Sequence, residues 1–326
     1  MRIALSARVL ACMGLILCAS AAWPQSQPYP NRPIRVIVPF PPGGTADPFT
    51  RTVAQKLVET WRQPVVVDNK PGAGTIIGTD LLAKAAPDGY TVMLSAASFT
   101  INPSISGKLP YDPVKDFAPI SLASRVVWML VVNSGVPVNS VKQLIDTLKA
   151  KPGQMNYSSM GNGTLNWLAG ELFKSMAGVD IVHVPYKGSG PSMMSVVSGE
   201  TSLTFAELFL LSPQVKAGKL RALAITGINR TPMAPGLPTL SESGLPGYDV
   251  SGWMGFMAPA GTPREVVQKW SLELSRILQL PDTREWQLSQ GLEPVGSTPE
   301  HFAEFIKAEI AKWGTLVKQS GIKADR

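Results

Sequence analysis

Short apolar runs alternate with segments of helical spacing along most of this chain, and loops rich in glycine and proline separate them. The apolar runs have strand length, as at 34–40, 65–67 and 91–95. This alternation predicts an α/β fold with parallel sheets, because each helix carries the chain back to begin another strand in the same direction. The 326 residues, of which 44% are hydrophobic, suffice for two domains with sizeable cores.

Residue pairs typical of helix starts stand before several of the helical segments. An N-cap side chain accepts a hydrogen bond from a free backbone N–H, proline fits the first helical position, and a capping box adds Glu or Gln three residues later. The pairs are Asp47 with Pro48, Ser140 with Gln143, Thr262 with Glu265, and Thr298 with Pro299.

The predicted elements leave two places where the chain can pass between two lobes, namely 120–132 and the proline-rich stretch 227–247. If both are crossings, one lobe takes both chain ends, 28–124 and 228–326, and the other takes 125–227. In open parallel sheets, ligands bind at the carboxyl ends of strands. Two such lobes facing each other would make a central ligand cleft.

The first 21 residues have the pattern of a secretory signal peptide. Arg2 and Arg8 come before the short apolar run 9–22. Ala19-Ser20-Ala21 supplies the small residues that signal peptidase needs. We expect cleavage after Ala21 and export to the periplasm. The run is too short for a membrane span. Cleavage would remove both cysteines and lower the formal net charge from +7 to +5. Lipid attachment at Cys12 or Cys18 is the alternative for this segment.

Signatures of catalysis, metal binding and nucleic-acid binding are missing from the sequence. It has no HExxH, Walker A or GxSxG pattern and only two histidines, His183 and His301. Its basic residues are scattered, so a net charge of +5 lends little support to a nucleic-acid partner. We therefore expect no cofactor, no metal and no catalysis. A Ser-His-Asp site using His183 is possible in principle but has no supporting context.

Glycine-rich loops lead from predicted strands into predicted helices at several points. Residues 39–47 and 158–164 each form such a junction, where free helix N–H groups can hold an anion. An ordinary capped helix start explains each loop equally well. Residues 72–78 follow a GxGxxxG spacing, which favours tight helix packing over dinucleotide binding. In 183–190, Tyr186 and Lys187 offer a phenol and a cation to a carboxylate.

In these motifs the chain resembles the Bug family, the periplasmic solute receptors of tripartite tricarboxylate transporters. The matching stretches follow the family's order from about residue 29 to the C-terminus. They include YPNRPIRVIVPFPPGGTAD, VVVDNKPGAGTIIG, KPGQMNYSSMGNGT, LAGELFKSMAGVDIVHVPYKGSGP and VKAGKLRALAITG. The resemblance implies a type II periplasmic-binding-protein fold, with two α/β lobes that close on a small organic acid.

The resemblance also implies a ligand site in which backbone amides, hydroxyls and bridging waters hold a carboxylate. The first lobe contributes two loops and the second lobe contributes three segments. The residues so implied are Phe40, Pro41, Gly43, Gly44, Thr45, Asp47, Ser95, Ala96, Ala97 and Ser98 from the first lobe, and Ser159, Gly161, Gly163, Thr164, Trp167, Pro185, Tyr186, Lys187, Ala206 and Glu207 from the second.

Two departures from the family pattern bear on the ligand. Trp167 stands where the family often has histidine, and Ala206, followed by Glu207, stands where it often has aspartate. We hypothesise that Ala206 removes a polar anchor and that Trp167 adds an apolar wall. Both changes favour a ligand with an apolar or aromatic body and one carboxylate. The alternative for Trp167 is that it packs away from the cleft.

The function expected from the sequence is therefore that of a periplasmic receptor. It would capture a small organic carboxylate by lobe closure and deliver it, as a monomer, to the permease subunits of a tripartite tricarboxylate transporter. An orphan ligand sensor that feeds a signalling partner and a periplasmic hydrolase on the same fold are the alternatives.

Overall fold

The computed structural model describes residues 29–320, the side chains of 319 and 320 excepted. The expected signal peptide, 1–21, lies outside the described residues. The chain divides into two units, Met1–Asn31 and Arg32–Arg326, and every helix and strand named below belongs to the second. Within the described residues, no helix is both long and apolar enough to cross a membrane.

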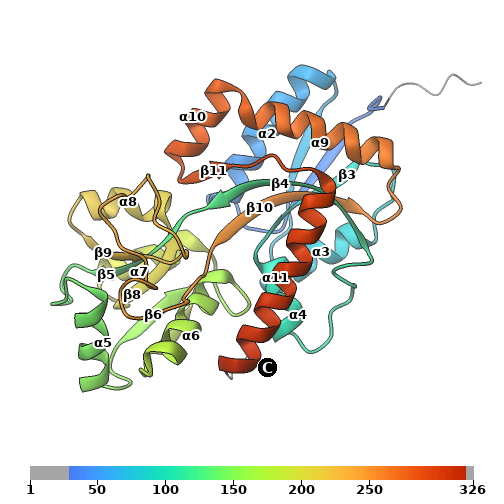
Figure 1. The fold of residues 1–326 in the computed structure, drawn as a ribbon. Helices are drawn as coiled ribbons and strands as arrows, with labels where there is room; N and C mark the ends of the chain where they lie inside the picture. The colour runs from blue at the N-terminus through green and yellow to red at the C-terminus, as the bar shows by residue number, and fades with distance from the viewer. Residues whose placement is uncertain (1–28, 321–326) are drawn as a thin grey trace, which may run out of the picture. The chain divides into compact units, whose positions relative to one another are not determined.

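The first sheet has six strands in the order β11-β4-β10-β3-β1-β2 (Figure 1). Its early strands run parallel, whereas β10 pairs antiparallel with β3 and β4, and β11 pairs antiparallel with β4. The strands are β1 (Ile34–Val38), β2 (Val65–Asn69), β3 (Thr91–Ala96), β4 (Phe117–Val126), β10 (Gly252–Pro259) and β11 (Leu292–Pro294). The accompanying helices are α2 (Ala46–Trp61), η1 (Ala73–Thr75), α3 (Ile76–Ala83), α4 (Ser98–Ile105), α9 (Arg264–Gln279), α10 (Pro281–Ser289) and α11 (Pro299–Ser320).

The second sheet has five strands in the order β7-β6-β8-β5-β9. β6 runs parallel to β7 and β8, whereas β5 runs antiparallel to β8 and β9. The strands are β5 (Trp128–Asn133), β6 (Asn156–Ser159), β7 (Val182–Pro185), β8 (Leu203–Glu207) and β9 (Leu220–Ile225). The helices are α5 (Val141–Ala150), α6 (Leu165–Ala177), α7 (Ser189–Ser198) and α8 (Leu208–Lys216).

The expectation of parallel sheets was wrong, because both sheets are mixed. β4 runs out of the first sheet and continues as β5 of the second after the single residue Val127. The chain returns through 226–251 to form β10, which enters the first sheet from the opposite end and therefore lies antiparallel to β4. No helix intervenes at the first crossing, so the rule that helices return the chain to a parallel strand does not apply there.

The first crossing, at Val127, falls within the stretch 120–132 that the sequence singled out, and the second, 226–251, includes the stretch 227–247. The strands before the first crossing and after the second lie in one sheet, and those between lie in the other. The exact lobe boundaries, 28–124 with 228–326 and 125–227, stay a prediction.

The predicted helix starts have mixed outcomes. The Ser140 hydroxyl accepts a hydrogen bond from the Gln143 N–H, and Thr298 does the same for His301. The predicted Asp47 cap was wrong, because α2 begins at Ala46 and Asp47 instead pairs with Arg51. The Thr262 capping box was also wrong, because the Thr262 hydroxyl donates to the carbonyl of Pro259.

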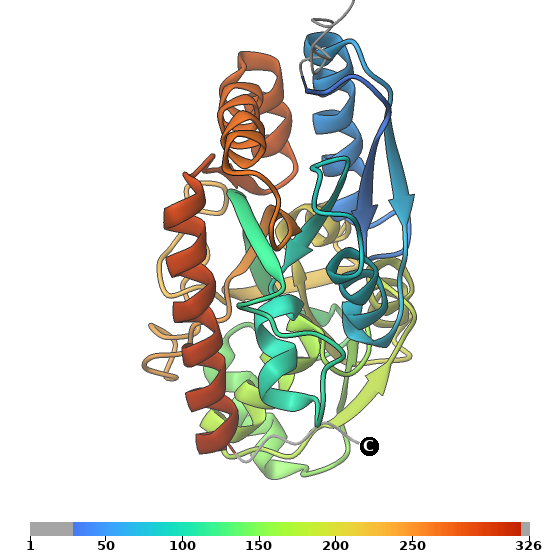
Figure 2. The same cartoon turned by 90° about the vertical axis from the view of Figure 1, so that its right-hand side faces the viewer.

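The long helix α11 covers part of the first sheet and lies beside α4, as Figure 2 shows. Its apolar face buries Phe302, Ile306 and Trp313. The ring of Phe302 meets Trp253 of β10 edge-on, with ring centroids 5.6 Å apart. The lower end of α11 also contacts α6, a helix of the second sheet's layer.

Gly170 of α6 allows the closest approach between a helix and the second sheet. A Cβ at this position would lie 2.2 Å from Cε2 of Tyr157, a fully buried residue of β6. The Tyr157 hydroxyl also donates to Glu171 at 2.7 Å, which fixes the ring against α6. The helix can therefore pack here only with glycine.

Gly170→Ala is expected to lower the free energy of unfolding by roughly 1–3 kcal/mol, because the added methyl group overpacks the α6–β6 contact. Urea denaturation measures the effect. Gly107→Ala is the control, since a Cβ at Gly107 meets nothing within 4 Å. Equal urea midpoints for Gly170→Ala and the wild type would contradict the prediction.

Candidate ligand-binding site

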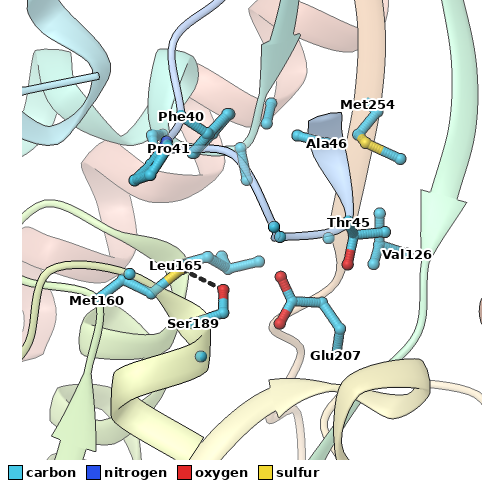
Figure 3. A pocket seen from close by; sticks show the side chains of 18 of the residues that line it. Phe40, Pro41, Thr45, Ala46, Val126, Met160, Leu165, Ser189, Glu207 and Met254 are labelled. Atoms are coloured by element: carbon cyan, nitrogen blue, oxygen red, sulfur yellow. Dashed lines mark hydrogen bonds between the residues drawn. The ribbon is translucent and has the colours of Figure 1, made fainter. Parts of the chain in front are cut away.

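A cavity of about 270 Å³ lies where the two sheets meet (Figure 3). Its wall combines segments from both sheets: the loop before α2, the junction of β3 and α4, the loop before α7, the end of β8, and both crossing strands. This volume is close to the lower end of the range for small-molecule pockets, about 300–1,000 Å³. The cavity therefore suits a small ligand.

Four helices begin at the cavity wall. They are α2 at Ala46, α4 at Ser98, α6 at Leu165 and α7 at Ser189, and all four residues line the cavity. None of the four N-cap residues makes a side-chain capping bond. The first N–H groups of each helix have no partner within the helix, and the helix dipole adds positive potential at the same end. The cavity is thus built to receive an anion.

The loop before α2 brings its backbone close to the cavity. Gly43 has φ 91°, a backbone conformation that residues other than glycine rarely adopt. It lies between Phe40 and Thr45, which also line the cavity. The strand–glycine loop–helix pattern in the sequence indicated this junction.

The floor of the cavity is apolar and comes from the two crossing strands. Val126 and Trp128 flank the first crossing, and Gly252, Trp253 and Met254 begin β10 after the second. Gly252 and Val126 are register partners in the first sheet. A Cβ on Gly252 would lie 2.4 Å from the Trp128 indole nitrogen, so the absence of a side chain there leaves room for the ring.

Glu207 places a carboxyl group in this wall. It ends β8 and precedes α8, and its side chain points into the cavity (Figure 3). Its residue exposure is only 8%, and its Oε2 atom has no hydrogen-bond partner in the described structure. Burial raises the pKa of Glu207 to about 7, and a hydrogen bond from its own backbone N–H offsets this only in part. Lys187 is the other charged residue among the described lining residues.

Half of the site residues expected from the sequence line the cavity. These are Phe40, Pro41, Gly43, Gly44, Thr45, Ala96, Ala97, Ser98, Lys187 and Glu207. The other half lie outside the lining: Asp47, Ser95, Ser159, Gly161, Gly163, Thr164, Trp167, Pro185, Tyr186 and Ala206.

Several residues outside the lining support the loop that carries Met160 into the cavity. The Ser159 hydroxyl lies 2.6 Å from His183 Nε2 and accepts a hydrogen bond from the Gly161 N–H. The Thr164 hydroxyl donates to the carbonyl of Gly161. Ser159 is fully buried. This serine–histidine pair therefore holds the loop's shape behind the cavity wall.

Trp167 and Ala206, on which the ligand hypothesis rested, are both absent from the cavity lining. Trp167 is buried on α6. Ala206 belongs to an apolar cluster with Val127 and Met129 on the other face of β8. Because side chains alternate along a strand, the next residue, Glu207, faces the cavity instead.

Sequence reasoning missed the cavity floor and much of the loop before α7. The missed lining residues are Pro42, Ala46, Val126, Trp128, Met160, Leu165, Gly188, Ser189, Gly190, Pro191, Gly252, Trp253 and Met254. The two predicted crossings were the available signal for the floor, since a cleft between two lobes must include the strands that join them. Among the described residues, no group of three or more His, Cys, Asp or Glu is placed to hold a metal ion.

Two α/β lobes around a cavity rich in helix N-termini define a solute-binding protein of the periplasmic-binding-protein fold. Residues 49–322 match the family described as the tripartite tricarboxylate transporter family receptor, TctC, and the chain belongs to this family. The resemblance found in the sequence is thereby confirmed at the level of the family, whose members are periplasmic solute-binding receptors.

Three solved structures of similar proteins support the fold. The periplasmic binding protein BugD is 33% identical, with a TM-score of 0.85 over 91% of this chain and 100% of BugD. Rpa4515 of R. palustris, solved with adipate, is 35% identical, with a TM-score of 0.86 over 90% of this chain and 99% of Rpa4515. MatC (Rpa3494) of Rhodopseudomonas palustris, with bound malate, is 29% identical, with a TM-score of 0.83 over 89% of this chain and 100% of MatC.

Glu207 makes the protein's stability depend on pH in a defined direction. Its pKa is about 7 when folded and near 4.5 when unfolded, so the folded state binds the proton more tightly. Its contribution to stability is fully present below pH 4.5 and is lost as the pH rises to 7. The shift corresponds to about 3 kcal/mol.

The expected result is that Glu207→Gln reduces the fall in the free energy of unfolding between pH 5 and pH 8. Denaturant titrations at each pH measure it. Glu285→Gln, at an exposed position of α10, is the matched control and should keep the wild-type slope. If the free energy of unfolding of Glu207→Gln changed with pH as it does in the wild type, burial would not disfavour the ionised form of Glu207.

Proposed function

We propose that this protein is a periplasmic receptor that binds a small organic carboxylate between its two lobes. The convergence of four uncapped helix N-termini on one cavity carries the proposal. Backbone N–H groups at helix starts bind carboxylates without needing a charged side chain. The adipate and malate bound by two relatives are carboxylates too, which supports the same ligand class.

Binding would act by closing the lobes. The α2 and α4 termini belong to the first sheet's layer, whereas the α6 and α7 termini belong to the second. An anion held by both groups of N–H donors stabilises the closed arrangement over the open one, so ligand shifts the equilibrium. No bond is made or broken in this cycle, and we propose no catalysis.

Delivery to the membrane follows from family membership as a further part of the proposal. The closed, loaded receptor would present its ligand to the permease subunits of a tripartite tricarboxylate transporter. The expected signal peptide would bring the chain to the periplasm, where such a receptor must work.

Export is tested by sequencing the N-terminus of the protein from a periplasmic extract. The expected mature chain begins at Ala22, because the peptidase site ends at Ala21. Retention of Met1 in the periplasmic protein would contradict cleavage, and recovery only from the cytoplasm would contradict the proposed location.

The role of the helix N-terminus is tested at Ser189, the first residue of α7. Ser189→Pro removes the backbone N–H of a residue that lines the cavity, and proline is tolerated at the first helical position. Gly188 before it has ψ 167°, which suits a residue preceding proline. The loss of one charge-assisted hydrogen bond predicts about tenfold weaker carboxylate binding.

Isothermal titration calorimetry with the most stabilising acid from a carboxylate panel measures this change. Ser189→Ala is the matched control, because it removes only the hydroxyl, which donates to Met160 Sδ. Equal affinities of Ser189→Pro and Ser189→Ala would show that the N–H does not bind the ligand. Equal binding of acids and their neutral amides would contradict the proposed ligand class.

A further inference from the structure

Glu207 lacks the partners that hold other buried charged groups in this protein. Buried Glu309, for comparison, accepts a hydrogen bond from Trp313 Nε1 at 3.1 Å and lies 3.6 Å from the ammonium of Lys312. None of the ion pairs among the described residues includes Glu207, and its Oε2 atom has no hydrogen-bond partner there. Burying an unpaired carboxylate is costly unless something else compensates it.

The position of Glu207 shows where such compensation would come from. Its carboxyl group is turned into the cavity, on the side where Thr45 and Ser189 also face (Figure 3). Among the described residues its carboxyl group makes no hydrogen bond to a second element of the fold, and its own backbone N–H is its one partner there. A partner for the ionised form of Glu207 would therefore come from a ligand in the cavity.

A second carboxylate is poorly matched to this position. The helix N-termini can hold one carboxylate, but another beside Glu207 would have to share a proton with it, because two adjacent carboxylates cannot both ionise. An ammonium group would instead pair with ionised Glu207 through a charge-assisted hydrogen bond. The helix N-termini of the two lobes would hold the negative end of a ligand, and Glu207 would hold a positive end.

We propose that Glu207 binds an ammonium group of the ligand, so that the cavity selects a small amino-carboxylate over a dicarboxylate of equal length. The inference rests on the proposed carboxylate-binding function and adds the chemistry of the ligand's second polar group. Glu207 thereby takes over the polar role that the sequence hypothesis regarded as lost at position 206. The apolar floor at Trp128 and Trp253 accommodates the carbon body between the two charges.

Few other ionisable groups surround Glu207. Lys187 is the one other charged residue in the described lining. The strands and helices packed on β8 are β5, β6, α6, α7 and α8. Their ionisable residues all lie outside the cavity lining: Tyr157 on β6, Glu171 and Lys174 on α6, and Lys216 on α8. Asp47 on α2 is paired with Arg51.

The pH dependence of binding then has a definite sign. With a pKa of about 7, Glu207 is mostly protonated at pH 6 in the empty protein. An ammonium ligand binds the ionised form, so its binding at pH 6 releases the Glu207 proton. Its affinity therefore rises as the pH increases from 6 to 8. A dicarboxylate that shares the Glu207 proton shows the opposite trend.

The test uses matched ligand sets that differ only at one end. Adipate, 6-aminohexanoate and hexanoate form a linear set, and terephthalate, 4-(aminomethyl)benzoate and 4-methylbenzoate form an aromatic set. Calorimetry at pH 6 and pH 8 measures the affinity of each for the wild type, Glu207→Gln and the control Glu285→Gln. Thermal melting of each variant establishes that it is folded.

The expected result is that the wild type at pH 8 binds the amino acid of at least one set about tenfold or more tightly than the matching diacid. Glu207→Gln abolishes this preference and Glu285→Gln keeps it. Wild-type affinity for the amino acid rises from pH 6 to pH 8, a readout that does not depend on any variant folding.

Equal or tighter binding of the diacids, or an unchanged preference in Glu207→Gln, overturns the inference while the carboxylate receptor stands. Binding of the monoacid as tightly as the amino acid overturns it as well, since the ammonium group would then contribute nothing. Failure of every carboxylate in both sets to bind overturns the proposed function together with the inference.

Discussion

The structure depends on the hydrogen bonds of one residue, Val127, at the place where the chain leaves the first sheet for the second. Its N–H donates to the carbonyl of Gly291, at 3.1 Å, and its carbonyl accepts from the N–H of Leu208, at 2.8 Å. Gly291 leads into β11 of the first sheet, and Leu208 follows β8 of the second. The return crossing is tied alongside, because the Thr226 N–H donates to the carbonyl of Trp128. Both crossings therefore lie next to each other, and they form the floor of the cavity.

The chemistry of the cavity follows from this arrangement. Strands that approach the crossing end at the cavity, and the glycine loops after β1 and β7 turn there into α2 and α7. Each turn places an uncapped helix N-terminus at the same cavity, where the helix dipole adds positive potential without a cluster of basic residues. This explains how a chain with a modest net charge and scattered cations can offer an anion site. The Trp128 ring can form part of the apolar floor because Gly252, its neighbour on β10, has no side chain that would collide with it.

The α/β class, most strands and the two crossings could be predicted from the sequence, because apolar runs and turn residues act over a few neighbouring positions. The antiparallel placement of β10 could not, since it depends on the direction from which the chain returns after more than a hundred residues in the other sheet. Within the site, the glycine loop at 40–45 was indicated by its strand-to-helix pattern, whereas residues 96–98 were expected only from the family resemblance. Trp167 and Ala206 were less informative, because a one-residue shift moves a strand side chain to the opposite face of its sheet and turns a helix side chain by about 100°. For the same reason the sequence hypothesis weighed Ala206 as the lost anchor, while Glu207 occupies the cavity.

Glu207 also has a place in the link between ligand and closure. It is bonded directly to Leu208, whose N–H holds the carbonyl of Val127 at the crossing. A ligand that pairs with Glu207 and also reaches the α2 and α4 termini spans the second sheet and the first on either side of that bond. A ligand that touches only one of them binds the open and closed arrangements equally and shifts nothing, however tightly it is held. In the proposed cycle, selection and closure would therefore depend on the same two-ended contact: the ligand that pairs with the buried carboxyl group would also be the one long enough to hold the lobes together.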